Sequence, residues 1–403
     1  KGAYRVAVEF LEQAFKIADD FNLVVQASES SSELMRLYAQ NLYDKKKLAF
    51  YSGRASHYQQ LRHNIFLIEK ELTIVRNMIQ ENRVNEEVAA YAAEQSERYR
   101  YLIEQHDDVR IYAAYYYMHI SGLFAAYDFQ GGADASKAAL DFFAKHGLAD
   151  SRQAQVFNST LITACVQLGQ YEEGAYLLEK TMKMVDKNGM NYFKMIEHGI
   201  LLGLRSGRYQ EAYEWYNKVD QKVMNETLNS GYAEYFPLYR GYLSFLVGIG
   251  KVRVKKGDKQ FTKLRLGRIL NETIGFSRDK RTMNVHLLIV QMLYYTILEQ
   301  YNNALERVDS ITKYCGRHLR RDENYRSRCF LKMLLELPIN GFHRVAVERN
   351  AKKWENKLAE MPFDIVSQSH EVEIIPFETL WELVVESLKN KRINHERIRA
   401  LNR

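Results

Sequence analysis

The sequence predicts an all-α fold, a right-handed α-solenoid of helical hairpins, on three observations. Only 4 prolines occur among 403 residues, and proline is the residue that interrupts helix interiors. Apolar residues recur at three- and four-residue steps along most of the chain, which is the period of an amphipathic helix. Three stretches, at 168–174, 206–212 and 298–304, share the pattern of the turn inside a helical hairpin, and the first two lie 38 residues apart. Repetition at this interval is typical of stacked hairpins.

Each of these stretches places three residue types where a tight turn between helices needs them. In the second stretch, Gly207 can adopt the left-handed backbone conformation that ends a helix. Tyr209 is expected to pack beneath the turn, and the small side chain of Ala212 lets the next helix approach closely. The corresponding residues are Gly169, Tyr171 and Gly174 in the first stretch, and Glu299, Tyr301 and Ala304 in the third.

The first part of the chain, residues 1–130, is predicted to contain longer helices than the repeats do. A helix at 3–18 carries its apolar residues on one face, namely Val6, Phe10, Leu11, Ala14 and Ile17. The hydroxyls of Ser30, Ser31 and Ser32 are suited to cap the start of a long helix, which we expect Gly53 to end. Further helices are expected at about 56–82, 85–105 and 109–128. We interpret this region as an N-terminal cap or a set of divergent repeats.

Residues 131–360 are predicted to hold the helical hairpins, and residues 361–403 to close the array. The expected helices lie at 151–168, 171–187, 190–206, 209–224, 226–249, 258–272, 281–299, 301–316, 322–337 and 341–359. After them, 364–375 is expected to be a short strand or an extended bridge. A last helix that begins near Pro376 is expected to cap the array, because a terminal repeat must cover an exposed core face.

The hairpin signature resembles that of the tetratricopeptide-repeat superfamily. The residues that carry the resemblance are Gly207, Tyr209, Ala212 and Tyr216, then Gly169, Tyr171 and Gly174, and finally Tyr301 and Ala304. The repeat is longer than the usual 34 or so residues, so the array is classed as divergent and tetratricopeptide-like. The resemblance implies a solenoid whose concave surface, lined by the first helix of each hairpin, binds a segment of a partner protein.

Positive charge is concentrated in the second half of the chain. Residues 1–200 carry a net charge of −4, and residues 201–403 carry a net charge of +11. The candidate partner-binding residues are Lys251, Arg253, Lys255, Lys256, Lys259, Lys263, Arg265, Arg268, Arg317, Arg320 and Arg321. Two interpretations stay open for them. They form either a solvated helix face with snorkelling side chains, or a patch for an acidic protein surface or a phosphate backbone.

The sequence contains none of the motifs that would indicate an enzyme. It has no phosphate-binding loop, no His-Glu-x-x-His and no Gly-x-Ser-x-Gly. Cys165, Cys315 and Cys329 are too irregularly spaced for a zinc site or a disulfide framework, and an odd, small number of cysteines favours a reducing, cytoplasmic compartment. We therefore expect no catalytic residues, cofactor, metal or small-molecule substrate. No apolar run approaches the ~20 residues of a membrane span.

The expected function is a non-enzymatic scaffold or adaptor that binds a protein partner through the solenoid surface. Two alternatives stay open. The first is electrostatic binding of RNA, or of a ribonucleoprotein such as the ribosome, through the basic region 251–321. The second is a peptide-responsive regulator, as some tetratricopeptide-repeat proteins are. Binding to nucleic acid would weaken steeply with salt and show little sequence preference.

Overall fold

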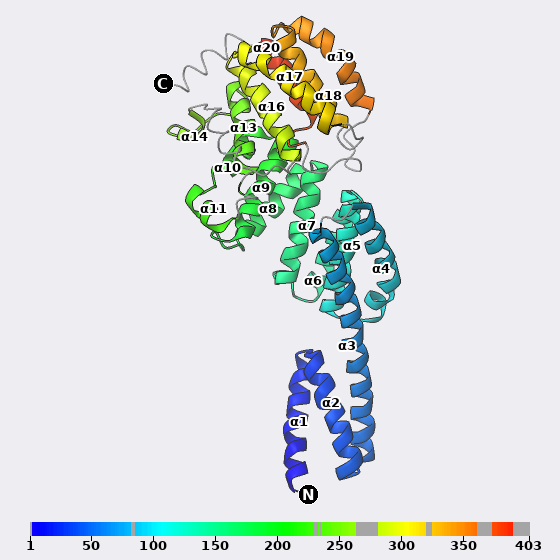
Figure 1. Ribbon diagram of the computed structural model, residues 1–403. Helices are drawn as coiled ribbons and strands as arrows, with labels where there is room; N and C mark the ends of the chain where they lie inside the picture. The colour runs from blue at the N-terminus through cyan, green and yellow to red at the C-terminus, as the bar shows by residue number, and fades with distance from the viewer. Residues whose placement is uncertain are drawn as a thin grey trace. The chain divides into compact units, whose positions relative to one another are not determined.

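The computed structural model describes residues 2–81, 85–228, 233, 235–262, 281–319, 325–360 and 373–389, and every regular element among them is a helix (Figure 1). The predicted all-α fold is therefore confirmed. Contacts divide the chain into two compact units. Unit 1 comprises Lys1–Ala126 with Asp134–Phe157, and unit 2 comprises Tyr127–Ala133 with Asn158–Arg403. The predicted boundaries at 130 and 360, and the handedness of the array, stay predictions.

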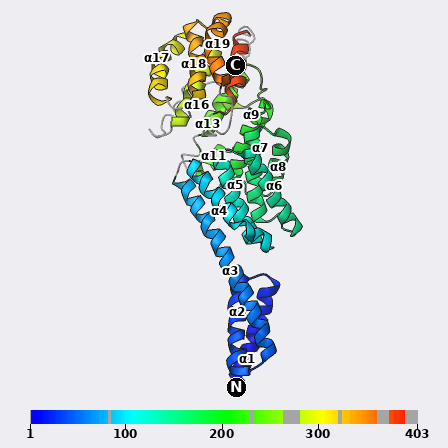
Figure 2. The ribbon, with the colours of Figure 1, turned by 90° about the vertical axis from the view of Figure 1, so that its right-hand side faces the viewer.

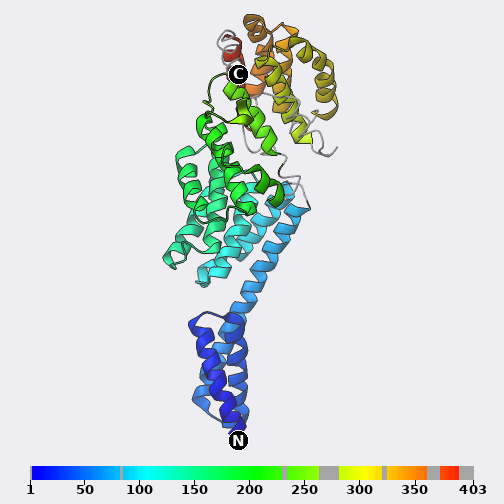
Figure 3. The same cartoon turned by 90° about the vertical axis from the view of Figure 1, so that its left-hand side faces the viewer.

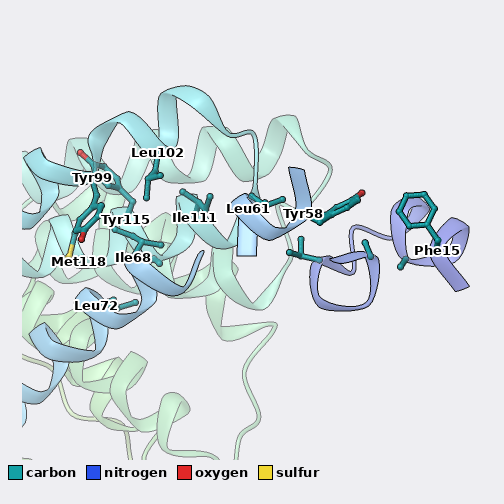
Figure 4. Close-up of a cluster of buried hydrophobic side chains, with 14 of the residues drawn as sticks. Phe15, Tyr58, Leu61, Ile68, Leu72, Tyr99, Leu102, Ile111, Tyr115 and Met118 are labelled. Carbon is teal, nitrogen blue, oxygen red and sulfur yellow. The ribbon is translucent and has the colours of Figure 1, made fainter. Parts of the chain in front are cut away.

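Unit 1 begins with an antiparallel bundle of α1 (Gly2–Asp20), α2 (Val24–Leu37) and the first half of α3 (Lys45–Gln80) (Figures 1 and 3). A short π-helix, Tyr38–Leu42, follows α2 directly. The second half of α3 packs against α5 (Val109–Ala125), and α4 (Asn85–Gln105) packs against both. One cluster of buried side chains runs through these helices, from Phe15 and Tyr58 at one end to Leu72 and Met118 at the other (Figure 4).

A second, smaller core completes unit 1. It joins the end of α5 to α6 (Phe129–Lys145) and to the beginning of α7 (Arg152–Leu168) (Figure 2). Phe143 and Phe157 are fully buried there, with ring centroids 5.7 Å apart. The helices predicted at 85–105, 109–128 and 151–168 therefore form close to their expected limits.

Helix α3 continues through Gly53, so the predicted helix end at this glycine is wrong. The chain instead turns at Tyr43, which has a φ of 57°. Asp44 then caps α3, because its side chain accepts hydrogen bonds from the backbone N–H groups of Lys46 and Lys47. A glycine inside a helix costs only about 1 kcal/mol relative to alanine. The burial of a 36-residue helix against its neighbours outweighs this cost.

The helix start predicted at Ser30–Ser32 is also wrong, because α2 begins at Val24. All three hydroxyls lie inside the helix and donate to carbonyl oxygens four residues earlier, for example Ser31 to Ala27. Serine forms such bonds within a helix as readily as it caps one. A run of serines therefore does not by itself locate a helix start.

Helix α1 buries only part of the predicted apolar stripe. Val8, Phe15 and Ala18 are buried and Leu11 packs against the same core, whereas Phe10 and Ile17 are more than half exposed. Polar contacts on the buried side support this rotation of the helix. Glu12 Oε1 accepts hydrogen bonds from the hydroxyls of Tyr38 and Tyr51 and from Lys47 Nζ, and Asp19 accepts from Arg54 and Tyr58.

Unit 2 holds the helices of the hairpin array. They are α8 (Tyr171–Met182), α9 (Met190–Arg205), α10 (Tyr209–Tyr216), α11 (Gln221–Thr227), α13 (Tyr235–Gly248), α14 (Lys259–Thr262), α16 (Arg281–Ile297), α17 (Tyr301–His318), α18 (Tyr325–Ile339), α19 (Arg344–Glu360) and α20 (Phe377–Lys389). Helices adjacent in the chain pack as pairs, namely α9 with α10, α16 with α17, and α18 with α19. The first helices α13, α16 and α18 also contact one another in sequence order. This arrangement is compatible with a helical-repeat protein. Residues 364–372 of the predicted bridge and most of the predicted helix at 258–272 lie outside the described residues, and 373–375 form no regular element.

The turns of the three signature stretches have the predicted backbone conformation. Gly169 and Gly207 have φ values of 67° and 74°, and Glu299 has 53° in the place of the glycine. Their neighbours close the helix ends, because the N–H of Gln170 donates to the Cys165 carbonyl and the N–H of Gln300 to that of Tyr295. The small residues Gly174, Ala212 and Ala304 are buried, Tyr216 packs on Phe261, and Tyr301 packs on Phe342 with ring centroids 4.4 Å apart.

Replacing Glu299 with glycine is expected to stabilise the α16–α17 hairpin. A side chain in the left-handed region costs about 1 kcal/mol, which glycine avoids. Urea unfolding followed by tryptophan fluorescence should show a higher midpoint for Glu299→Gly. The fluorescence reports unit 2, because this unit contains all three tryptophans, Trp215, Trp354 and Trp381. The matched change Gly207→Ala should lower the midpoint, and equal shifts in both variants would contradict this account.

Candidate interaction surfaces of the helical array

The segment Lys251–Asp258, which follows α13, is fixed to α10 through its backbone. The Gln210 side chain accepts from the backbone N–H of Arg253 at 2.9 Å and donates to the Arg253 carbonyl at 3.3 Å. The Tyr213 hydroxyl accepts from the N–H of Lys255 at 2.9 Å and donates to Asp258 Oδ2 at 2.7 Å. Helix α10 therefore holds the main chain, while the side chains of Arg253, Lys255 and Lys256 are exposed to solvent.

Three cations of the segment are exposed and unpaired. Arg253, Lys255 and Lys256 are exposed, and no carboxylate among the described residues lies within ion-pair distance of them. Lys251 differs, because its ammonium group lies 2.9 Å from Glu386 of α20. Lys255 and Lys256 are adjacent in the chain and Arg253 lies two positions earlier. The sequence therefore identified the charged residues, but not the anchors Gln210 and Tyr213, whose only signal was their place after a repeat turn.

The other predicted members of the basic patch are only partly described. Arg317 is exposed near the end of α17, and α14 begins at Lys259. Lys263, Arg265, Arg268, Arg320 and Arg321 lie outside the described residues. A continuous patch over 251–321 therefore stays a prediction, and the candidate site is limited to the three cations at Arg253, Lys255 and Lys256.

The surface formed by the first helices is partly covered by the chain's own last helix. Helix α20 contacts α16, α18 and α19, and lies beside them in the views (Figures 1 and 2). It is buried on nearly every side, and Glu382 is the one exposed residue among its described side chains. Phe377 stacks on Phe330 of α18 at 4.4 Å. The expected capping helix thus forms, and part of the surface proposed to hold a partner is occupied by it.

A buried ion-pair cluster holds the start of α20 to α18. The Arg326 guanidinium is fully buried and forms two hydrogen bonds to each of the Glu373 and Glu378 carboxylates, the shortest at 2.6 Å. It also donates to the Leu358 carbonyl at the end of α19. Burial lowers the pKa of Arg326, but the bonds to Glu373 and Glu378 outweigh burial and raise it overall. The cluster therefore joins three helices through one permanently charged side chain.

The partly buried His198 of α9 is expected to make the stability of unit 2 depend on pH. Desolvation lowers its pKa to about 4, with a smaller contribution from Lys194, and its Nδ1 atom is buried with no hydrogen-bond partner among the described residues. The unfolded chain binds a proton near pH 6.5, whereas the folded chain does not. Stability is therefore expected to fall as the pH drops from 6.5 to 4, by at most roughly 3 kcal/mol.

Urea unfolding at pH 7 and pH 5, followed by tryptophan fluorescence, tests this pH dependence. His198→Gln removes the titrating group, so its midpoint should change less between the two pH values than that of the unsubstituted protein. An equal loss in both proteins would assign the acid sensitivity to other groups.

The described cysteines and other potential metal ligands do not form a reactive site. Cys165, Cys315 and Cys329 are buried free thiols, and burial raises the pKa of Cys315 and Cys329, which keeps them protonated and poorly nucleophilic. No group of three or more potential metal ligands is found among the described residues. Within the same residues, no helix is both long enough and apolar enough to cross a bilayer.

Comparison with known proteins gives no further guide to the site. No family model, no curated protein and no solved structure matches this chain. The likeness to tetratricopeptide repeats therefore rests on the turn residues and on the paired packing of the helices.

Proposed function

We propose that this protein is a non-enzymatic scaffold that binds an acidic protein partner through its helical array. The observation that supports the proposal is the group of three exposed cations at Arg253, Lys255 and Lys256. They have no ion-pair partner among the described residues, and their backbone is held at Arg253 and Lys255. A rigid backbone beneath charged side chains lowers the entropy lost on binding. Their charge would also raise the rate of encounter with an acidic surface.

A protein partner fits the described surface better than RNA does. Proteins that bind single-stranded nucleic acid combine a basic groove with exposed aromatic rings on which bases stack. Two aromatic residues that flank the segment, Tyr213 and Phe261, are fully buried against each other with ring centroids 5.2 Å apart. Neither can stack on a base, so these two described rings offer the segment no stacking platform. The capture experiment below includes a nuclease treatment that would detect binding to RNA.

Affinity capture with charge-reversed protein tests the proposal. The tagged protein is incubated with native lysate, with and without nuclease, at about 0.15 M and 0.5 M salt. Retained proteins are identified by mass spectrometry. The triple variant Arg253→Glu, Lys255→Glu, Lys256→Glu is expected to retain at least about tenfold less of the partner, because each reversal replaces an attraction with a repulsion.

A matched control uses three exposed lysines of the same unit away from the segment, in the variant Lys187→Glu, Lys222→Glu, Lys313→Glu. It changes the net charge equally and should retain the partner. Loss of the signal after nuclease treatment would favour RNA. Equal retention by all three proteins would show that the segment does not bind the partner.

A further inference from the structure

The first helix exposes an apolar stripe that its own unit leaves uncovered. Val6, Phe10, Ile17 and Phe21 are 52%, 67%, 56% and 73% exposed. At 100° per residue they lie within about 60° of one another around the axis, over about 22 Å of length. Phe21 continues the last turn, because its N–H donates to the Ile17 carbonyl. Large exposed apolar stripes on folded proteins mark interaction sites.

The stripe cannot turn inward, because polar anchors fix the rotation of α1. The opposite face is held by Glu12, which bonds to Tyr38, Tyr51 and Lys47 of the π-helix and α3. Asp19, in the last turn of the helix, forms an ion pair with Arg54. Turning Phe10 and Ile17 into the core would break both sets of contacts. The stripe is therefore a permanent feature of the surface of unit 1.

The stripe is self-complementary about its midpoint. Its residues pair by size when the helix is laid against a reversed copy of itself: Val6 with Phe21, Phe10 with Ile17, and Gln13 with Ala14. The charges along one edge also pair with opposite sign, since Arg5 would face Asp20 and Glu9 would face Lys16. All four charged residues are exposed, and none has an ion-pair partner among the described residues.

We infer that α1 is a homodimer interface, in which two copies of the chain pack their α1 helices antiparallel around a two-fold axis near Gln13. In an antiparallel pair each edge of a helix meets the same edge of its partner, so the Arg5–Asp20 and Glu9–Lys16 contacts form twice. In a parallel pair this charged edge would meet the opposite edge, where Ala7 and Ala14 lie, and the charges would have no partners. The charge pattern therefore selects the antiparallel arrangement. This inference is independent of the proposed binding of an acidic partner.

Sedimentation equilibrium on the full chain tests the dimer. The expected mass is twice the chain mass of 47.3 kDa. The variant Phe10→Gln, Ile17→Gln should weaken dimerisation at least about tenfold, since it removes the two central apolar contacts from each copy. Both residues are exposed, so the folded monomer should keep its helix content. The control Tyr176→Gln, Val345→Gln changes two equally exposed residues of unit 2 and should dimerise normally.

Charge exchange and cross-linking test the register. Glu9→Lys and Lys16→Glu should each weaken the dimer, and mixing the two variants should restore it, because each then faces the opposite charge. Oxidised Gln13→Cys should form a disulfide-linked dimer, whereas Phe21→Cys should not, since its two copies lie at opposite ends of the helix pair. The three native cysteines are buried and should not interfere.

A monomer at all concentrations up to about 100 µM would overturn the inference and assign the stripe to another occupant. A dimer that survives Phe10→Gln, Ile17→Gln would place the interface elsewhere. Cross-linking through Phe21→Cys instead of Gln13→Cys would reject the antiparallel register.

Discussion

Replacing Arg326 with methionine is expected to destabilise unit 2 by about 3–5 kcal/mol, the usual result when one partner of a buried ion pair is removed. The reason lies in Glu373, whose side chain is fully buried beside the guanidinium. Without the cation, Glu373 must either remain charged in an apolar environment or take up a proton. Glu378, which is 42% exposed, can turn to solvent and contributes less of the loss.

Urea unfolding followed by tryptophan fluorescence measures this effect. Trp381 lies in α20 itself and is 5% exposed, so its emission should shift to longer wavelength as the helix leaves the array. Arg344→Met removes a comparable charge from the half-exposed pair with Glu348 and should cost less than about 1 kcal/mol. Arg326→Met combined with Glu373→Gln should recover part of the loss, because no charge is then buried alone. A loss below about 1 kcal/mol for Arg326→Met would show that the cluster does not hold α20 in place.

The sequence predicted most helices of the array, because helical periodicity and turn chemistry are local properties. The helix predicted at 209–224 is wrong, since the chain forms α10 (Tyr209–Tyr216) and α11 (Gln221–Thr227) instead, and in place of the helix predicted at 226–249 the structure describes α13 (Tyr235–Gly248). Gly169 and Gly207 were identified correctly, and even Glu299 takes the conformation predicted for a glycine. The face that each helix buries was harder to predict. In α1 the predicted apolar stripe indicated one face, but the helix buries the neighbouring face of Val8, Phe15 and Ala18. There Glu12 also accepts hydrogen bonds from Tyr38 and Tyr51, which lie 26 and 39 residues away.

The candidate site was likewise predictable only in its charges. Clustering of Arg253, Lys255 and Lys256 is visible in a list of residues, whereas their anchoring by Gln210 requires a contact across 43 residues. A last capping helix was expected, but its contacts with α16 and α18 could not be foreseen. Arg326 lies 47 residues from Glu373, and nothing in the local sequence indicates that the two side chains meet.

Replacing Gly203 with alanine is expected to destabilise unit 2 by about 1–3 kcal/mol, although alanine is the better helix former by about 1 kcal/mol. Gly203 of α9 lies against the start of α10. A Cβ atom there would lie 2.8 Å from the Arg208 carbonyl oxygen and 2.9 Å from both the nitrogen and the Cβ of Ala212. Backbone atoms cannot move aside, so the added methyl group must force the two helices apart.

A similar close approach occurs one hairpin earlier. A Cβ on Gly174 of α8 would lie 2.8 Å from a methyl group of Leu202 in α9 and 3.1 Å from the Cβ of Cys165 in α7, nine residues earlier. In both hairpins a glycine on one helix faces a small residue on the other. Gly53→Ala in α3 is the matched control, because a Cβ at this exposed position would meet nothing within 4 Å. It should stabilise unit 1 by about 0.5–1 kcal/mol, since only helix propensity changes. Urea unfolding followed by circular dichroism at 222 nm should show unfolding midpoints that move in opposite directions for the two variants. A shift of the same sign in both would mean that the close helix approach at Gly203 does not limit the size of the side chain at this position.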